Sequence, residues 1–402
     1  MTEMTMLLEG LKVIDAASFV AGPAAATVMA DFGADVIKVE PPEGESYRYL
    51  AARYRTNYFW QLTSRNKRGL ALDLRTEAGQ EVIHRLVDDA DVLLVNFNEK
   101  QLRNYRLDYD YLQSRNPRLI FAHMTGYGSR GPDRAKRAFD LAAWWARTGI
   151  MDMMKPKDGH PVNGVGGVGD HASAMSLFAA IMLGLYHRER TGQGRYVSSS
   201  LAANGVWANG MQLQSTIAGN DVATALKEKG QVSPFTGAFE SRDGRYVVLV
   251  GAVPEREWPR LCRALERTEW LADERFADMA GIMSHREEVK GMFAREFSRL
   301  KLDDIVRRLD AEDATYSVLA ENREVIEDAQ LIENEYLVRT ASANPDFQWT
   351  ISSPIAVAGA SKRVPGDPPE VGQNSVAILR ELGYEDTDIE QLLANRVTKQ
   401  FI

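Results

Sequence analysis

The segment GVGGVGDHASAM, residues 164–175, places one carboxylate, Asp170, after four glycines that fall within six positions. Three kinds of chemistry use such a stretch. A glycine-rich loop can hold a phosphate, an Asp-His pair can contribute to a metal site, and an isolated carboxylate can act as a nucleophile. The structural alternative is that Asp170 caps the helix that follows it.

Two of these possibilities are disfavoured by the neighbouring residues. A phosphate at the start of the helix would be repelled by the Asp170 carboxylate. A metal site needs more ligands, yet of the six histidines only His171 and His187 lie in this segment, at a spacing of sixteen that matches no ligand pair. Helix capping and catalysis both stay open, and they are compatible. Helix amides would keep the pKa of this carboxylate low and the group ionised, as a carboxylate nucleophile requires.

Two clusters of basic residues flank strands of the predicted sheet. The first contains Arg65, Lys67, Arg68 and Arg75, and the second contains Arg134, Lys136 and Arg137. Most such charges lie on solvated surface. In a chain of net charge −8, however, two basic clusters beside one sheet indicate a local pocket for a polyanionic small molecule.

The elements that must position these residues alternate between strand and helix. Strands are predicted at 11–17, 34–40, 68–75, 91–97, 119–128 and 195–201, and helices at 21–33, 76–90, 104–116 and 171–188. Pro23 and Gly33 mark the ends of the first helix, and Thr76 caps the second. Such βαβ units predict a doubly wound α/β domain that binds ligands at the carboxyl ends of its strands. No GxGxxG follows the first strand, so a dinucleotide cofactor is not indicated.

The second half of the chain indicates a smaller domain, followed by a final segment that completes the large domain. We expect a first large-domain segment at 1–217, a linker at 218–230, a small α+β domain at 231–320 and a final segment at 321–402. With 402 residues, the chain is long enough for two cores.

Composition limits the partners. The acidic balance, with a pI near 5.5, excludes a global basic field for nucleic acid or anionic lipid. The single cysteine, Cys262, rules out an intramolecular disulfide and is expected to be a buried, small apolar residue. No signal peptide is evident, and the longest apolar-rich run, 174–186, is shorter than the ~20 residues of a membrane span. We therefore expect a soluble, cytoplasmic protein without a membrane partner.

Seven stretches, in this order, resemble the family III CoA-transferases, which include formyl-CoA, carnitine and benzylsuccinate CoA-transferases. They are LEGLKVIDAASFVAGPAAATVMADFGADVIKVEPPEG, NKRGLALDL, LVNF, TGYGSRGP, GVGDHASAM, RTGQGRYV and ILRELGY. The resemblance covers nearly the whole chain and is closest over residues 8–205. It implies an interlocked homodimer. Each chain would have a Rossmann-like large domain, completed by the C-terminal segment, and a smaller domain between.

The resemblance also implies a mechanism. Asp170 falls on the position of the family's nucleophile, which attacks an acyl-CoA thioester and becomes an aspartyl-CoA thioester before a carboxylic acid accepts the CoA. Coenzyme A is then a substrate, and neither a metal nor a permanently bound cofactor is needed. Gly166, Gly167 and Gly169 would keep bulky side chains away from the acyl group, and nearby backbone amides would bind the oxyanion.

The resemblance also implies which residues contact coenzyme A, position by position. They are Val20, Leu72, Arg75, Asn96, Phe97, Arg103, Arg137 and Gly169. The chain departs from the family pattern at two of the neighbouring positions. Asn104 stands where a basic residue is usual, with Arg103 and Arg106 near it, and Pro41 replaces a charged residue.

Alternatives to a transferase are a racemase acting on an α-methylacyl-CoA and a CoA-binding protein without turnover. The racemase relative uses a His-Asp dipeptide, and here that place reads Phe139-Asp140, so one of its two bases is missing. The presence of Asp170 argues against a protein that only binds CoA. The glycine run of the formyl-CoA enzymes is replaced by GQVSPFTGAFESRDG. We expect small C4–C5 dicarboxylates such as mesaconate or succinate as substrates.

Overall fold

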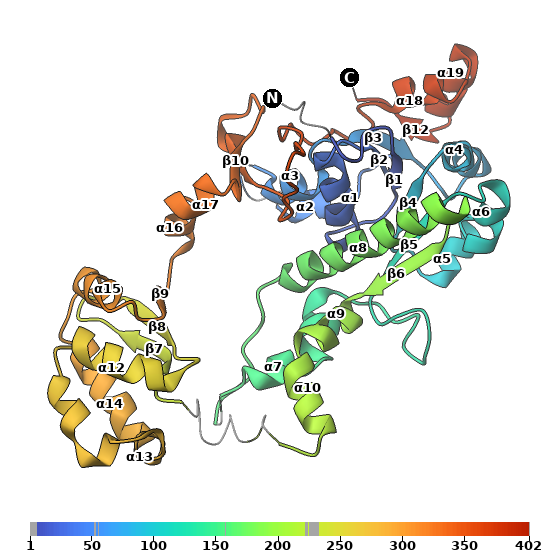
Figure 1. Ribbon diagram of the computed structural model, residues 1–402. Helices are drawn as coiled ribbons and strands as arrows, with labels where there is room; N and C mark the ends of the chain where they lie inside the picture. The colour runs from blue at the N-terminus through green and yellow to red at the C-terminus, as the bar shows by residue number, and fades with distance from the viewer. Residues whose placement is uncertain are drawn as a thin grey trace. The chain divides into compact units, whose positions relative to one another are not determined.

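The computed structural model describes residues 6–51, 54, 56–156, 158–221, 224 and 233–401. The chain forms two compact units, which Figure 1 shows with their element labels. Unit 1 contains Met1–Lys155, Gly159–Gln214 and Ala329–Ile402, and unit 2 contains Pro156–Asp158 and Ser215–Asp328.

Unit 1 is built on a seven-stranded sheet of order β12-β3-β2-β1-β4-β5-β6. Its strands are β1 (Lys12–Asp15), β2 (Asp35–Glu40), β3 (Arg68–Leu72), β4 (Val92–Val95), β5 (Ile120–Thr125), β6 (Tyr196–Ser200) and β12 (Thr398–Lys399). All neighbouring strands run parallel except β12, which pairs antiparallel with β3 through Thr398 opposite Leu72. Six strands thus have the doubly wound order that the βαβ pattern predicts.

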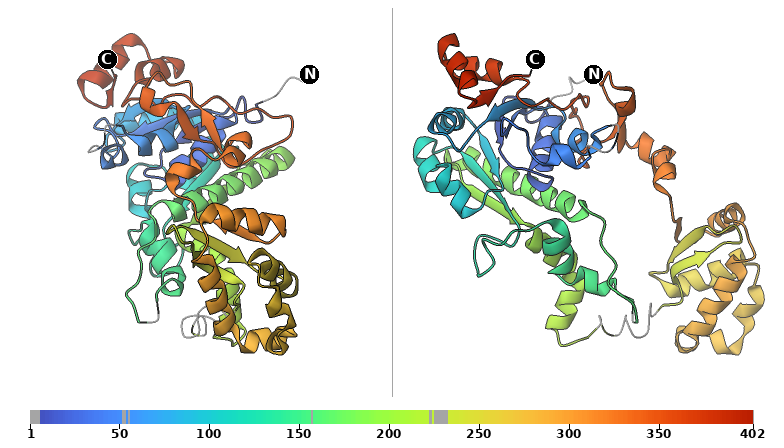
Figure 2. Two further views of the ribbon diagram at one scale, coloured as in Figure 1. Left: turned by 90° about the vertical axis from the view of Figure 1, so that its left-hand side faces the viewer. Right: turned by 180° about the vertical axis from the view of Figure 1, so that it is seen from behind.

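Helices cover both faces of this sheet, as the views in Figures 1 and 2 show. On one face, strand residues such as Val13 and Leu94 pack with α1 (Ala21–Asp31) and α8 (Val168–Thr191). On the other face, Ile14 and Leu93 pack with α4 (Glu77–Asp88), α6 (Tyr109–Arg115), α18 (Ser375–Glu381) and α19 (Asp386–Ala394). The strands are therefore continuously apolar, because both of their faces are buried.

The remaining elements of unit 1 are short. They are α2 (Tyr47–Leu50), α3 (Tyr58–Ser64), α5 (Glu99–Asn104), η1 (Leu141–Ala146), α7 (Ile150–Met153), α9 (Leu201–Ala208), α10 (Gly210–Ile217, which continues into unit 2), α17 (Ala329–Glu333), β10 (Leu337–Arg339), η4 (Pro345–Phe347) and β11 (Trp349–Ile351). The helix predicted at 104–116 is interrupted: Arg106 adopts a left-handed backbone (φ 54°), and Asp108 caps α6 anew by accepting from the Tyr111 amide at 3.1 Å. Thr76 caps α4 as predicted, accepting from the Gly79 amide at 3.0 Å.

Helix α8 is the longest helix among the described residues, and it starts three residues earlier than predicted, at Val168. Its boundary residues, Gly167 (φ 86°) and Gly192 (φ 74°), both have left-handed backbones. One stripe of α8 is buried against α1, β5 and β6, as expected of a core helix. By length and composition alone α8 could cross a membrane, a test that core helices of soluble proteins also pass.

Unit 2 combines a three-stranded antiparallel sheet with a set of helices. The sheet contains β7 (Thr236–Glu240), β8 (Tyr246–Val250) and β9 (Tyr316–Val318) in that order. The helices are α12 (Pro254–Ala264), η2 (Thr268–Ala272), η3 (Glu274–Phe276), α13 (Met279–Ser284), α14 (Arg286–Phe297), α15 (Leu302–Ala311) and α16 (Asn322–Val325). An aromatic-rich core joins them. Cys262 lies in this core on α12 with no exposed surface, as predicted.

Candidate active site

A cavity in unit 1, called the main cavity below, opens at the carboxyl ends of the parallel strands. It has a volume of about 630 Å³. Ser18–Val20 line it after β1, Asn96 and Phe97 after β4, and Gly126 after β5, while Asp170 reaches it from the first turn of α8. In a doubly wound fold this edge of the sheet is where ligands bind.

A second cavity of about 370 Å³, the side cavity, adjoins the main one. The two share Ser18, Phe19 and Phe97. The side cavity is further lined by Leu72 and Arg75 after β3 and by Pro41 and Glu45 after β2. The two cavities together follow the ends of five adjacent strands, β3, β2, β1, β4 and β5.

The structure brings most of the sequence-predicted site residues to these two cavities. The main cavity is lined by Val20, Asn96, Phe97, Arg103, Arg137 and Asp170, and the side cavity by Leu72, Arg75 and Phe97. Gly169 lines neither. A Cβ built on it would lie 2.5 Å from Cγ of Trp144, so its missing side chain makes room for that buried ring. The predicted clearance for an acyl group at this position stays a prediction. Gly166, by contrast, faces open space.

Asp170 is the third residue of α8, not its cap, and the prediction of a low pKa for its carboxylate is wrong. The residue that immediately precedes the helix is Gly167. Burial, and then the negative charge of Asp140, raise the pKa of Asp170 to about 7. These two effects outweigh the positive end of the helix dipole. A carboxylate of this kind is a stronger base and a less hydrated nucleophile than an exposed aspartate.

Asp140 supports the start of α8 from outside the helix. Its buried carboxylate accepts a hydrogen bond from the Gly167 amide through Oδ2, at 2.7 Å. This contact satisfies a backbone donor that the helix itself leaves free. Sequence reasoning had considered Asp140 only as half of the racemase dipeptide, because its partner Gly167 is 27 residues away.

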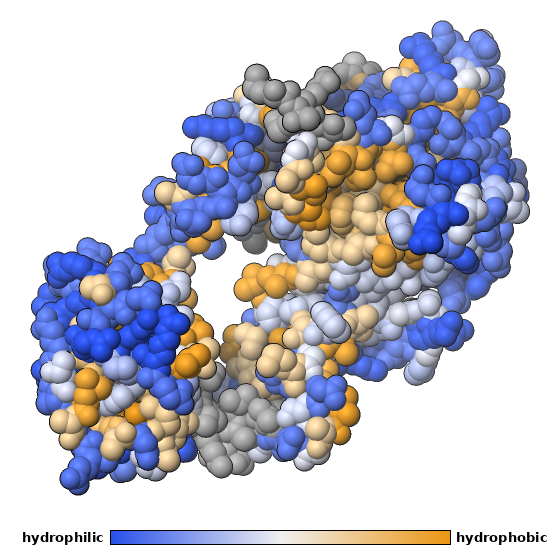
Figure 3. Space-filling view, in the orientation of Figure 1, coloured by the Kyte–Doolittle hydropathy of each residue, from blue (hydrophilic) through white to orange (hydrophobic). Residues whose placement is uncertain are grey.

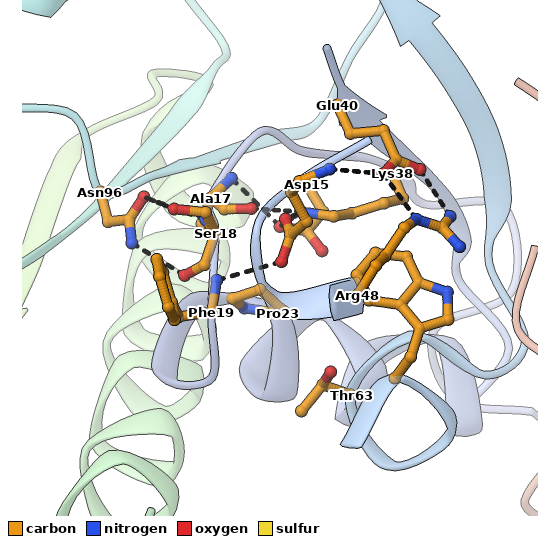
Figure 4. A network of polar contacts seen from close by, with 12 residues as sticks. Asp15, Ala17, Ser18, Phe19, Pro23, Lys38, Glu40, Arg48, Thr63 and Asn96 are labelled. Carbon is orange, nitrogen blue, oxygen red and sulfur yellow. Dashed lines mark hydrogen bonds and ion pairs between the residues drawn. The ribbon is translucent and has the colours of Figure 1, made fainter. Parts of the chain in front are cut away.

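The turn between β1 and α1 is held by a buried polar network, shown in Figure 4. Phe19 has a left-handed backbone (φ 65°), and its amide donates to Glu45 Oε1 at 3.2 Å. Lys38 pairs with Glu45 at 2.7 Å. Such a conformation is unfavourable for an aromatic residue and is kept only where surrounding contacts enforce it. The network thus fixes a residue that lines both cavities.

Asn96 holds the same turn from β4. Its side-chain Oδ1 accepts from the Ser18 amide at 3.0 Å, and its Nδ2 donates to the Ser18 carbonyl at 2.9 Å, so both groups of the amide contact one backbone unit (Figure 4). Asn96 was predicted as a CoA contact. Its polar atoms position Ser18.

Of the first basic cluster, only Arg75 lines a cavity; Arg65, Lys67 and Arg68 line neither of the two, contrary to the prediction. Arg65 pairs with Asp31, Lys67 with Asp15 and Arg68 with Asp35, at 2.6–2.8 Å. Lys67 and Arg65 are buried, and burial lowers the pKa of Lys67 to about 8. The second cluster, Arg134, Lys136 and Arg137, does line the main cavity. Charge patterns alone do not separate the two cases, because the carboxylates that neutralise Arg65 and Lys67 lie more than 30 residues away in sequence.

No group of three or more potential metal ligands from His, Cys, Asp and Glu occurs among the residues described by the structure. Burial lowers the pKa of His171, beside the nucleophile candidate, and so favours its neutral form.

A family model for CoA-transferase family III matches residues 8–375. The chain belongs to this family. The match spans the six parallel strands of unit 1, the Asp170 segment and unit 2, so the family assignment rests on most of the chain and not on one motif.

Several family III relatives and solved structures are similar over nearly the full length. The (R)-2-hydroxy-4-methylpentanoate CoA-transferase of Clostridioides difficile is 27% identical, with 98% of this chain and 100% of that protein covered. The cinnamoyl-CoA:phenyllactate CoA-transferase of Clostridium sporogenes is 30% identical, covering 98% and 97%. The succinyl-CoA:mesaconate CoA-transferase of Haloarcula marismortui is 28% identical, covering 94% and 97%. A crystal structure of a CAIB/BAIF family protein from Brucella suis is 27% identical, with a TM-score of 0.82, covering 94% and 100%.

The relatives are named as CoA-transferases, so the chain is an enzyme of that class acting on acyl-CoA and carboxylates. The racemase alternative is not favoured by these relatives. The structure places Phe139, which replaces the histidine of the racemase dipeptide, in the main cavity beside Phe19, with ring centroids 5.1 Å apart.

Proposed function

We propose that this protein transfers CoA from an acyl-CoA thioester to a carboxylic acid through an aspartyl-CoA thioester on Asp170. The observation that carries the proposal is the position of Asp170. It is a partly buried carboxylate on the main cavity, at the strand ends where this fold binds ligands, and basic side chains line the same cavity.

The transfer is a sequence of four acyl substitutions. The Asp170 carboxylate attacks the donor thioester carbonyl, the C–S bond breaks, and a mixed anhydride and CoA thiolate form. The thiolate then attacks the aspartyl carbonyl of the anhydride, giving aspartyl-CoA and releasing the donor acid as its carboxylate. The acceptor carboxylate attacks aspartyl-CoA and regenerates an anhydride and the thiolate. Attack of the thiolate on the acceptor carbonyl gives the new acyl-CoA and restores Asp170. One thioester replaces another, and the electrons and charges balance at each step.

The raised pKa of Asp170 suits its role as the nucleophile. A carboxylate that is poorly hydrated loses little solvation when it attacks, and it is an effective nucleophile for a thioester. As a leaving group it departs from an anhydride, which is an easy step. Backbone amides near the start of α8 are candidate donors for the oxyanion of each tetrahedral intermediate.

We propose that CoA occupies the two cavities together. Arg75 in the side cavity and Arg103 and Arg137 in the main cavity are the candidate partners of its phosphates. Val20, Leu72 and Phe97 offer apolar contacts for the pantetheine and the base. This placement leaves the thioester near Asp170, since Asp170 and Arg137 line the same cavity.

Membership of the family indicates the type of reaction more narrowly than it indicates the donor and acceptor acids. The sequence-based prediction of C4–C5 dicarboxylates such as mesaconate or succinate has a relative of matching name, but other relatives of similar identity are named for branched or aromatic acids. The side chains around Asp170 must therefore indicate which donor and acceptor acids the enzyme uses.

We also propose that the active form is a homodimer. Unit 1 exposes large apolar side chains on three helices: Leu183 and Tyr186 on α8, Val206 and Trp207 on α9, and Met211 on α10. Trp207 is 87% exposed and Met211 85%, and Figure 3 shows apolar surface around α8. A second copy of the chain, in the interlocked arrangement that the family resemblance implies, would cover this surface. Light scattering after gel filtration without detergent should give about twice the 44.9 kDa chain mass. A monomer there would refute the dimer.

Trapping of the covalent intermediate tests the proposed mechanism. After incubation with acyl-CoA donors, mass spectrometry should find CoA on the peptide that contains Asp170, and hydroxylamine should convert that adduct to an aspartyl hydroxamate. Asp170→Ala should lower transfer by about 10³-fold or more, because the nucleophile is removed. The matched control is Asp303→Ala, since Asp303 is an exposed aspartate in the first turn of α15. Unchanged transfer by Asp170→Ala would refute the mechanism.

A further inference from the structure

Aromatic rings gather on one side of Asp170. Phe139 and Phe19 line the main cavity with it, and their ring centroids lie 5.1 Å apart at 78°. Phe19 in turn contacts Tyr47 at 5.9 Å, and Tyr47 stacks on Phe59 at 5.5 Å and 23°. Burial, and then the charge of Asp170, raise the pKa of Tyr47, which places its phenol within the electrostatic reach of that carboxylate. These four residues, Phe19, Tyr47, Phe59 and Phe139, are called the ring cluster below.

The ring cluster offers free apolar surface beside the reacting group. Phe139 is 58% exposed although it lines a cavity, and Phe19 and Phe59 are half-buried. An exposed phenyl ring next to a nucleophile gains stability when a ligand covers it, because apolar surface is then removed from water.

Two lysines near the ring cluster, Lys67 and Lys38, are already neutralised. Lys67 Nζ donates to Asp15 Oδ2 at 2.8 Å and to the carbonyls of Pro23 and Thr63, both at 2.7 Å. Lys38 pairs with Glu45 at 2.7 Å and also donates to the Ala17 carbonyl. Both lysines are buried. Neither has an ammonium group available for the distal carboxylate of a substrate.

The negative charge of Asp140, which acts electrostatically on Asp170, would oppose a second carboxylate in the same region. Four basic side chains line the main cavity elsewhere: Arg103 and Arg134 contact Glu99 on α5, Lys136 Nζ lies 5.7 Å from the Tyr127 ring centroid, and Arg137 is a proposed partner of the CoA phosphates. A second carboxylate that lay against the ring cluster would place an unpaired charge next to phenyl rings, which is costly.

We infer that the acyl site takes a group whose side chain is apolar and ends without charge, an aryl or branched alkyl chain, in preference to an acyl group with a second carboxylate. The inference rests on the proposed function in one respect, that the acyl carbonyl lies at Asp170. It replaces the sequence-based prediction of C4–C5 dicarboxylates with a substrate class that the ring cluster recognises, and it assigns Phe139 and Phe19 as specificity-determining residues.

Binding without turnover separates this inference from the mechanism. In the full-length Asp170→Ala variant, which has no nucleophile, calorimetry should show that 3-phenylpropanoyl-CoA binds about tenfold or more tightly than succinyl-CoA. Adding Phe139→Ala to that variant should weaken binding of 3-phenylpropanoyl-CoA by about fivefold to tenfold and leave succinyl-CoA nearly unaffected. Binding of free CoA, measured for each variant, shows whether the CoA site is still folded. Phe401→Ala removes an exposed ring outside both cavities and is the matched control.

Turnover by the wild-type enzyme provides the second arm. With 3-phenylpropanoate, 4-methylpentanoate, succinate and mesaconate as acceptors, the first two should have the higher kcat/KM. Equal or tighter binding of succinyl-CoA, or faster transfer to the dicarboxylates, would overturn the substrate class and leave the aspartyl mechanism standing. Transfer that survives Asp170→Ala would instead overturn the mechanism, while the binding comparison would still decide the substrate class.

Discussion

The Asp140 carboxylate accepts a hydrogen bond from the Gly167 amide at 2.7 Å, and its charge acts on Asp170, three residues further along the chain. One residue therefore both supports the start of α8 and helps to set the proton affinity of the proposed nucleophile. The two effects can be separated, because an asparagine at position 140 keeps an acceptor for the amide and loses the charge.

The first prediction concerns the pH dependence of catalysis. Asp170 must be ionised to attack, and burial and Asp140 raise its pKa to about 7, so kcat/KM should rise between pH 6 and pH 8 with a midpoint near 7. In Asp140→Asn the midpoint should move to lower pH, since the repelling charge is gone. Burial, the larger cause, is kept, so the midpoint should stay above that of an ordinary aspartate. pH–rate profiles of the two proteins measure this shift.

Asp140→Ala serves as the control for that experiment. It removes the charge and also the acceptor of the Gly167 amide, so it should shift the pH midpoint in the same direction and additionally lower the thermal stability. An acid limb that is identical in wild type and Asp140→Asn would show that Asp140 does not set the pKa of Asp170.

The second prediction concerns stability. The pKa of Asp170 is higher in the folded protein than in the unfolded chain, so the folded state holds a proton more tightly. Its contribution to stability is therefore fully present below about pH 4 and declines as pH rises towards 7. Asp170→Asn should raise the free energy of unfolding at pH 8, by about 1–4 kcal/mol, and have a smaller effect at pH 5. Urea unfolding at the two pH values tests this. A variant that is destabilised most at pH 8 would contradict the predicted sign.

The third prediction concerns CoA binding by the second basic cluster. Arg137→Ala should raise the KM for acyl-CoA by about tenfold, with a smaller change in kcat, because a phosphate contact is lost while the reacting groups are unchanged. Salt should weaken acyl-CoA binding to wild type more than to the variant. Arg307→Ala, on the exposed face of α15, is the matched control. An unaltered KM in Arg137→Ala would place the phosphates elsewhere.

The doubly wound α/β fold of unit 1 could be predicted from sequence, because each βαβ unit is encoded locally by an apolar run, a helix and a second apolar run. The pairing of β12 with β3 could not, since Thr398 and Leu72 are joined only in the fold. Likewise, the position of Asp170 beside a ligand site was predictable, but its raised pKa was not. That shift depends on burial and on Asp140, and neither is encoded in the residues next to it.

The basic residues show the same limit. Lys67 and Arg137 have similar sequence neighbourhoods, each in a short basic stretch beside a strand. Asp15, which neutralises Lys67, is 52 residues away in sequence, so the sequence predicted a ligand contact where the structure has a buried ion pair. Only tertiary contacts distinguish Lys67, which is held in a buried ion pair, from Arg137, which lines the main cavity.

The last prediction uses two glycines of the segment that carries Asp170. At Gly169 a Cβ would lie 2.5 Å from Cγ of the buried Trp144 ring, whereas at Gly166 nothing lies within 4 Å and the backbone is not left-handed. Gly169→Ala should therefore destabilise the protein by about 1–3 kcal/mol and displace the first turn of α8, so that transfer activity falls as well. Gly166→Ala should leave the stability within about 0.5 kcal/mol of wild type. Thermal unfolding and transfer assays on the two variants test the difference. If both variants lose transfer activity while keeping wild-type stability, the glycines act by leaving space for the acyl group, as the sequence first indicated, and not through Trp144.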